Sequence, residues 1–212
     1  MPGDTVLGDA HATAPSIPAW RGWWLRADTA LRLGPRPVAL FAWHRLRLSL
    51  GIAHRALPAL PAPAGPFLPG AKPIAVLAQD WHGPFNPSTH ALDILAQPIT
   101  DIRSLWEAHR LAPLLHLALA AKRDPAGDHL HRAEALLVDW TAANPPFRGP
   151  GWACAQEAAL RAMGFALALA LLDADRALTP GARQWLALHA KRIRATRAYG
   201  AAQDNNHPIS EA

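Results

Sequence analysis

From Asp101 onward, the chain consists of segments in which apolar residues recur at helical spacing, bounded by capping residues or by proline and glycine. Such segments predict amphipathic helices. The predicted helices cover residues 101–122, 128–143, 153–172 and 180–199. Short loops join them and no strand alternation interrupts them, so we expect an all-α arrangement of antiparallel helices, layered or toroidal.

Capping residues mark where these helices should begin. Asp101 and Asp128 have side chains that cap helix N-termini well, and Thr179 stands before Pro180, which suits a first helical turn. The helix predicted over 153–172 is apolar almost all round and is therefore expected to be central.

The region before residue 73 has a different character. It is a Trp- and Arg-rich arm, followed by a Pro-rich linker over 57–73. Helices are predicted in the arm over 20–33 and 37–50. The apolar run at 73–78 predicts a short strand. We expect two parts: an arm with its linker over 1–72, and a helical domain over 73–212.

Charge and hydropathy narrow the choice of partners. Lys and Arg total 21 against 16 Asp and Glu, and the net charge of +5 favours an anionic partner. The arginines are scattered rather than gathered in a stripe with aromatic residues, so nucleic acid is not expected. The longest apolar run, 162–172, is shorter than the ~20 residues of a membrane span. Residues 1–16 lack the features of a Sec signal peptide, which makes the cytoplasm the default location and leaves the periplasm open.

Metal and cofactor signatures are missing from the sequence. Cys154 is the single cysteine, and the 11 histidines include no His-Glu-x-x-His pattern. The pairs His109/His116 and His129/His131 have no carboxylate or cysteine at ligand spacing. Gly-rich nucleotide loops and a nucleophile elbow are also absent, so we expect no metal and no cofactor.

Charged pairs stand on two of the predicted helices. Glu107 and Arg110, three residues apart, share a helix face and can be explained as a solvated ion pair. Glu157 and Arg161, four apart, stand among Ala, Leu, Met and Phe. Charges in such a setting must be paired or must line a wet cavity, and the sequence leaves both interpretations open.

A third polar group lies near the end of the sequence, where Asn205, Asn206 and His207 precede a predicted helix start and Glu211 follows. Such donors at a helix N-terminus favour an anion. Simple helix capping by one asparagine is the alternative.

These pieces occur in a specific order. The ordered series is Asp101 to Arg110, Asp139-Trp140, Asn144-Pro145-Pro146, Gly151-Trp152, Gln156-Glu157 to Arg161, and Asn205-Asn206-His207 to Glu211. It resembles the N-terminal helical domain of the heparinase II/III family of polysaccharide lyases and of related alginate lyases. The resemblance covers about half the chain, and 73–83 is similar to the short strand segment that precedes this domain in such proteins.

The resemblance implies an α/α toroid, a following β-sandwich domain, and a cleft that binds an acidic polysaccharide. The implied reaction is β-elimination at a uronate, in which Asn206 and His207 neutralise the carboxylate and Asn205 assists. The other residues implied to bind substrate are Glu107, Arg110, Trp152, Glu157, Arg161 and Glu211. We expect Glu107, Arg110, Glu157 and Arg161 to converge near the Asn205–His207 loop.

The general base and acid of such lyases, a Tyr and a His, come later than residue 212. We therefore expect an incomplete toroid that lacks the β-sandwich and does not turn over alone. The only tyrosine, Tyr199, precedes the Asn-Asn-His motif and is not assigned to that role. The alternative interpretations are a non-catalytic helical module that binds acidic glycans, or a decayed remnant of a lyase.

Overall fold

A computed structural model describes residues 28–72, 74–75, 79–97 and 101–203. The helices are α2 (Pro35–Ser49), α3 (Ile52–Ala56), α4 (Arg103–His109), α5 (Pro113–Arg123), α6 (His129–Ala143), α7 (Ala155–Leu171), α8 (Pro180–Ala195) and α9 (Arg197–Ala202), with 3-10 turns η1 (Ile94–Ala96) and η2 (Pro150–Trp152). Residues 28–33 are also helical, and no strand occurs in the described ranges. The predicted all-α class is confirmed for this part of the chain.

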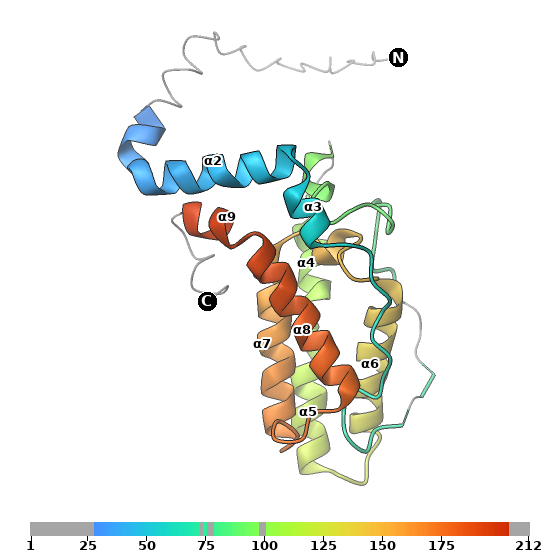
Figure 1. The fold of residues 1–212 in the computed structure, drawn as a ribbon. Coiled ribbons are helices and arrows are strands. Elements are labelled where there is room, and N and C mark those ends of the chain that lie inside the picture. Colours follow the sequence, from blue (N-terminus) through green and yellow to red (C-terminus); the bar gives the residue numbers. More distant parts are fainter. Residues whose placement is uncertain (1–27, 73, 76–78, 98–100, 204–212) are drawn as a thin grey trace, which may run out of the picture.

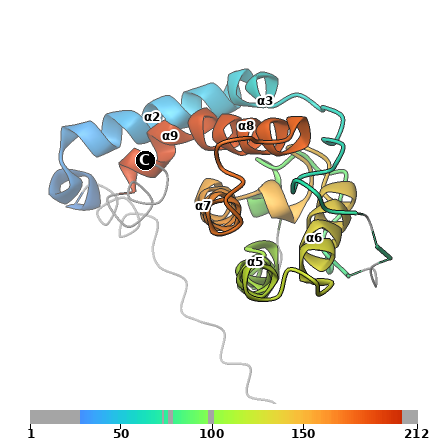
Figure 2. The same cartoon turned by 90° about the horizontal axis from the view of Figure 1, so that it is seen from below.

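Helices α5 to α8 form the body of the molecule (Figure 1). α5 packs against both α6 and α7, and α8 packs against α7. Viewed from below, α2 runs across one side of this body and lies along α9 (Figure 2). None of the described helices combines the length and the hydropathy that a bilayer crossing would need.

Tryptophan side chains fill the centre of the core. Trp140, Trp152 and Trp185 are buried, and the rings of Trp152 and Trp185 lie 5.6 and 5.7 Å from that of Trp140. The His189 ring stacks on Trp185 at 3.7 Å. These large rings join α6, η2 and α8, because each buries a wide apolar surface at once.

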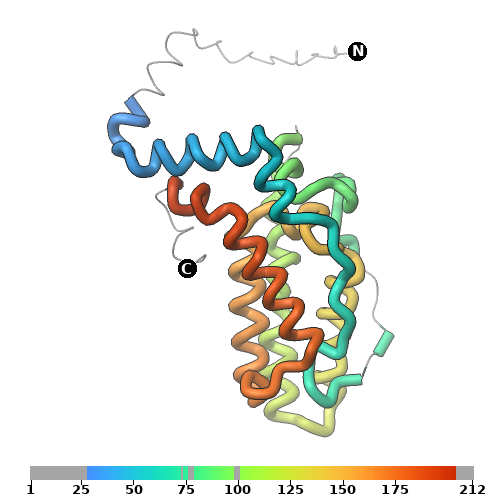
Figure 3. The backbone as a smooth tube through the Cα atoms, in the orientation of Figure 1, coloured from blue at the N-terminus to red at the C-terminus, as the bar shows by residue number. Residues whose placement is uncertain are grey.

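The linker packs onto the helices along the length of the body (Figure 3). Phe67 and Leu68 are buried, and their backbone N–H groups donate to the Glu134 carboxylate of α6 at 2.7 to 3.0 Å. The Thr179 hydroxyl, at the start of α8, donates to the Phe67 carbonyl. Burial raises the pKa of the Glu134 carboxyl above its usual value, and these N–H donors oppose that rise.

Several predicted helix boundaries are confirmed. Thr179 caps α8, since its hydroxyl accepts from the Ala182 N–H at 3.0 Å with Pro180 in the first turn. α6 begins directly after Asp128, and α7 covers most of the central helix predicted over 153–172. α2 corresponds to the helix predicted over 37–50.

The single helix predicted over 101–122 is wrong. α4 ends at His109 and α5 begins at Pro113, with Leu111 between them at φ 57°. Proline cannot continue a helix because it lacks an N–H and its ring clashes with the preceding turn. The predicted N-cap is also wrong, because Ile102 rather than Asp101 is the N-cap of α4. The Asp101 carboxylate lies one residue earlier and accepts the Arg103 N–H at 3.0 Å.

Two further predictions concern the last described helices and the segment at 73–78. The helix predicted over 180–199 is divided at Thr196, where α8 ends and α9 begins. Of the strand predicted over 73–78, only Ile74 and Ala75 are described, and both are in coil. The tryptophans of the first predicted arm helix lie outside the described residues.

Candidate functional site

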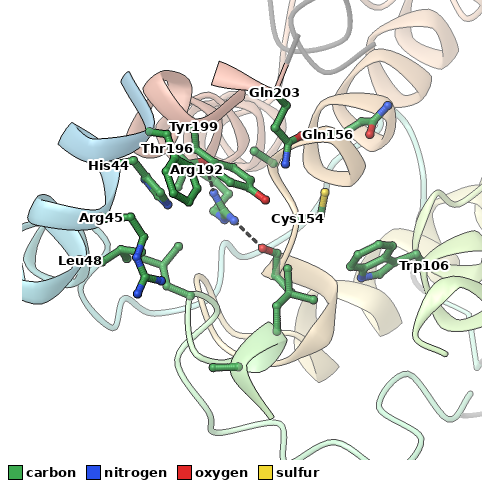
Figure 4. Close-up of a pocket in the computed structure, with 16 residues that line it drawn as sticks. His44, Arg45, Leu48, Trp106, Cys154, Gln156, Arg192, Thr196, Tyr199 and Gln203 are labelled. Atoms are coloured by element: carbon green, nitrogen blue, oxygen red, sulfur yellow. Dashed lines mark hydrogen bonds between the residues drawn. The ribbon is translucent and has the colours of Figure 1, made fainter. Parts of the chain in front are cut away.

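A pocket of about 570 Å³ lies where the α2–α9 pair meets the body of the molecule. Its walls come from α2, the segment around η1, α4, the start of α7, and the α8–α9 junction. The residues that line it are Phe41, His44, Arg45, Leu48, Leu92, Leu95, Ala96, Trp106, Ala153, Cys154, Ala155, Gln156, Arg192, Thr196, Tyr199 and Gln203. Figure 4 shows His44 and Arg45 on one side of it and Cys154, Gln156 and Trp106 on the other.

The electrostatic character of the pocket is positive. Among the described residues that line it are Arg45 and Arg192, and none is Asp or Glu. The wall also contains Ala155 and Gln156, the first residues of the 17-residue helix α7. A helix N-terminus carries partial positive charge, so the start of α7 and the two arginines of this wall favour an anion.

Arg192 is fixed in the pocket floor. It is buried, and its Nε and Nη2 donate to the Trp152 and Ala153 carbonyls at 2.6 Å each. Nη1 donates to the Thr196 hydroxyl at 2.9 Å. Arg192 therefore supplies a preorganised positive charge and holds the backbone before α7 in place.

His44 and Tyr199 connect α2 to α9 at the pocket. Their rings lie 4.8 Å apart (Figure 4). Burial lowers the pKa of His44, and the charges of Arg47, Arg45 and Arg192 lower it further. The imidazole is therefore neutral at neutral pH and can donate or accept a hydrogen bond.

Cys154 lies directly before α7. Burial raises the pKa of its thiol, although the Glu157 and Gln156 N–H groups and Arg192 oppose that rise. The thiol is thus protonated at neutral pH, which is not the state of an activated nucleophile.

Trp106 also lines the pocket. Its indole nitrogen is buried and has no hydrogen-bond partner among the described residues. A buried unpaired donor costs about 1 to 3 kcal/mol.

Two of the predicted substrate-binding residues are brought together by a contact between helices. Arg110, directly after the end of α4, donates twice to Glu157 of α7, Nε to Oε2 at 2.7 Å and Nη2 to Oε1 at 2.9 Å. The hydrogen bond with Glu157 raises the pKa of Arg110, and Glu107 adds to that rise. Glu107 is exposed on α4, near this pair. Glu157 directly follows Gln156 of the pocket wall.

Arg161 and Trp152, also predicted to bind substrate, lie in the interior. Arg161 donates to the His109 and Gly151 carbonyls at 3.1 and 2.9 Å and to His189 Nε2 at 2.9 Å. Burial lowers the pKa of Arg161 to about 9, so it stays charged at neutral pH. Trp152 donates its indole N–H to the Asn144 carbonyl. The structure thus gives both side chains contacts that position the turn before α7.

The remaining predicted site residues are Asn205, Asn206, His207 and Glu211. All lie outside the described residues, so the expected convergence on the Asn205–His207 loop is not described either.

Sequence reasoning missed the contribution of the arm to this pocket. His44 and Arg45 come from α2, which the sequence analysis assigned to a separate part of the chain. Tyr199, to which the sequence assigned no catalytic role, also lines this pocket. The aromatic and basic residues of α2 could have indicated that this helix takes part in a binding site. The sequence around them does not indicate that α2 packs against α9.

A further group lies beside the pocket, where His54, His90 and Asp93 come together as the described residues that could hold a metal ion. No spacing in the sequence indicated this group, because His54 is 36 residues from His90.

Comparison of the chain with protein families, with curated proteins and with solved structures finds no match.

Proposed function

We propose that this chain is part of a polysaccharide lyase, and that its pocket binds a uronate-containing acidic glycan. The observation that carries the proposal is the composition of the pocket wall, which joins Arg45, Arg192 and the start of α7 with no acidic residue among its described members. The resemblance of the ordered motifs to the heparinase II/III family points to the same chemistry independently.

The pocket offers the mixture of groups that an acidic sugar needs. Arg45 is exposed and free to pair with a carboxylate or sulfate, which guanidinium groups bind in a two-point geometry. Gln156 supplies an amide for hydroxyl groups, and Trp106 supplies an apolar face. A neutral sugar would leave the positive wall uncompensated.

The Asn-Asn-His motif follows this wall in sequence. Gln203 lines the pocket, and Asn206 is three residues later. We include the motif in the proposal because of this position in the sequence and because of the resemblance.

In the proposed reaction, a base removes the C5 proton of the uronate and a C4=C5 double bond forms as the bond from C4 to the glycosidic oxygen breaks. The leaving oxygen takes up a proton from an acid, and the other product is an unsaturated sugar. Negative charge accumulates next to the carboxylate as the proton leaves. Donors from Asn206 and His207 stabilise that charge in the manner of an oxyanion hole.

The test is a titration of the chain with uronate oligosaccharides from alginate and from heparin, with a neutral oligosaccharide of equal length as the control. Arg45→Gln should weaken binding of the acidic ligands, whereas Arg103→Gln, whose side chain is 84% exposed on α4, should not. Ultraviolet absorbance of the unsaturated product reports elimination.

Acidic-ligand binding that depends on Arg45, together with product from the complete reading frame, supports the lyase. Binding with no product from that complete protein supports the non-catalytic glycan-binding module instead. Failure to bind acidic oligosaccharides, or equal binding of the neutral control, overturns the proposal.

A further inference from the structure

Two histidines and an aspartate meet between α3 and the segment that leads into η1. His54 lies on α3, while His90 and Asp93 belong to the turn before Ile94. Each offers one ligand atom, and these atoms all lie within 4.8 Å of one another. His54 Nε2 is already 2.8 Å from Asp93 Oδ1, and the rings of His54 and His90 are 4.6 Å apart.

Hydrogen bonds hold the His90 ring in the neutral form that metal binding requires. Its Nε2 faces the Leu57 carbonyl at 3.1 Å, so that nitrogen carries the proton. Its Nδ1 accepts the Leu92 N–H at 3.2 Å and therefore has a lone pair. Metal-bound histidines commonly donate their other ring N–H to a backbone carbonyl, as His90 does to Leu57. A metal ion bound to Nδ1 would replace the long hydrogen bond from the Leu92 N–H.

The distances are close to those of a coordinated ion. Zinc binds histidine nitrogen and carboxylate oxygen at about 2.0 to 2.2 Å, which places tetrahedral ligand atoms roughly 3.3 Å apart. The ligand atoms now lie up to 4.8 Å apart, so small side-chain rotations that shorten each distance by at most about 1.5 Å would bring them to the separation found around zinc. The side chains of His54 and Asp93 are 33% and 54% exposed, so an ion can enter and water can complete its coordination.

We propose that His54, His90 and Asp93 form a binding site for a divalent transition-metal ion of the zinc type. Two imidazoles and one carboxylate are ligands that zinc, cobalt and nickel accept, with one or more positions left for water. The site is separate from the proposed glycan function, because none of its three residues lines the pocket.

A bound metal ion would link the segment that forms this pocket wall to α3. Leu92, Leu95 and Ala96, which line the pocket, are in or beside the turn that carries His90 and Asp93. An ion that also binds His54 would therefore restrain this wall. Since it binds the folded state, it would also raise the stability of the chain.

The experiment uses the full chain stripped with a chelator and then titrated with Zn²⁺ by equilibrium dialysis, and with Co²⁺ by visible absorption. One tightly bound ion per chain is expected. His54→Ala and Asp93→Asn should each weaken binding at least about tenfold, because even residues that only support a ligand affect affinity by 10- to 100-fold. The midpoint of thermal unfolding should rise with Zn²⁺ in the wild type, and much less in these variants.

His129→Ala is the matched control. His129 Nε2 lies 3.9 Å from Asp124 Oδ2, and no third ligand joins this histidine–carboxylate pair among the described residues, so its removal should leave binding unchanged. Asp93→Asn keeps the size of the side chain, so it tests the site even if His54→Ala fails to fold. No binding, or binding that survives both His54→Ala and Asp93→Asn, overturns the metal site, whereas glycan titration tests the pocket independently.

Discussion

Arg110, directly after α4, and Glu157 of α7 form a two-point ion pair, with N–O distances of 2.7 and 2.9 Å. The Glu157 side chain is only 5% exposed, whereas that of Arg110 is 43% exposed. Glu157 thus has Arg110 as its hydrogen-bonded counter-ion, and the buried Arg161 also feels its charge. This pair joins the first turn of α7, which borders the pocket, to the helix that carries Trp106.

Replacing Arg110 should destabilise the protein. Arg110→Met leaves the Glu157 carboxylate buried without its partner, at a cost of about 1 to 3 kcal/mol. We expect the free energy of unfolding, measured in urea, to fall by that amount. Arg103→Met, on the exposed side of α4, should change it by less than about 0.5 kcal/mol. Equal effects of the two substitutions would mean that the pair contributes nothing to stability.

Stability should fall as the pH is lowered, because two buried histidines resist protonation. Burial lowers the pKa of His109 to about 3, with the charge of Arg161 as a further cause, and lowers that of His189 well below 6.5. Unfolding returns both groups to about 6.5. Their contribution is therefore fully present above pH 6.5 and is lost as the pH falls toward the folded-state values.

The expected loss is roughly 1.4 kcal/mol per pH unit for each histidine between about pH 6 and the folded-state pKa. Urea unfolding at pH 7.5, 6.5, 5.5 and 4.5 would measure it. His189→Gln should reduce the slope, while His116→Gln, on the exposed face of α5, should leave it unchanged. A free energy of unfolding that is flat over this range would contradict the prediction.

Local signals in the sequence predicted most of the helices, because their starts and stops depend on neighbouring residues. Thr179 with Pro180 is such a signal, and its geometry is as expected. The break between α4 and α5 also has a local signal, which is Pro113. The apolar residues before and after it keep helical spacing, and this pattern led to the prediction of one continuous helix. Toroid closure and the motif at 205–207 remain predictions.

The candidate site was less accessible to sequence reasoning, because it depends on contacts between distant segments. Helical spacing paired Glu157 with Arg161, yet its hydrogen-bonded partner is Arg110, 47 residues earlier. The pocket likewise needs α2 to meet α9, and no local pattern specifies that contact. The sequence shows which charged residues stand among apolar ones, but the packing of the helices decides which of them form ion pairs.

A pair of glycines in neighbouring helices should respond in opposite ways to alanine. At Gly181, in the first turn of α8, an added Cβ would lie 2.5 Å from the Ala64 carbonyl oxygen and 2.9 Å from that of Pro66. Gly181→Ala must displace the linker backbone and should cost about 1 to 3 kcal/mol. At Gly164 in α7 the nearest atom would be 4.0 Å away.

Gly164→Ala should therefore stabilise the protein by about 0.5 to 1 kcal/mol, because alanine loses less conformational freedom in a helix. Thermal unfolding of both variants would compare them directly. If Gly181→Ala were as stable as the wild type, the linker would not lie against α8 as closely as it does here.

The lyase proposal predicts different kinetic effects for two kinds of residue. Arg45 would hold the acidic chain in the ground state and the transition state alike, so Arg45→Gln should raise KM with little change in kcat. Asn206 and His207 would act on charge that grows as the C5 proton leaves, so their contribution is larger in the transition state. Asn206→Ala and His207→Ala should each lower kcat by ~10² to 10³, which is the usual cost of losing one such donor.

Rates would be followed through the ultraviolet absorbance of the unsaturated product, in the protein encoded by the complete reading frame. Binding of the same oligosaccharide, measured by calorimetry, separates the two effects because it does not depend on turnover. We expect Asn206→Ala to retain most of its affinity while losing rate, and Arg45→Gln to show the reverse. An Asn206→Ala or His207→Ala variant with full kcat and altered KM would remove that residue from the elimination step, since a donor that stabilises only the transition state must change kcat.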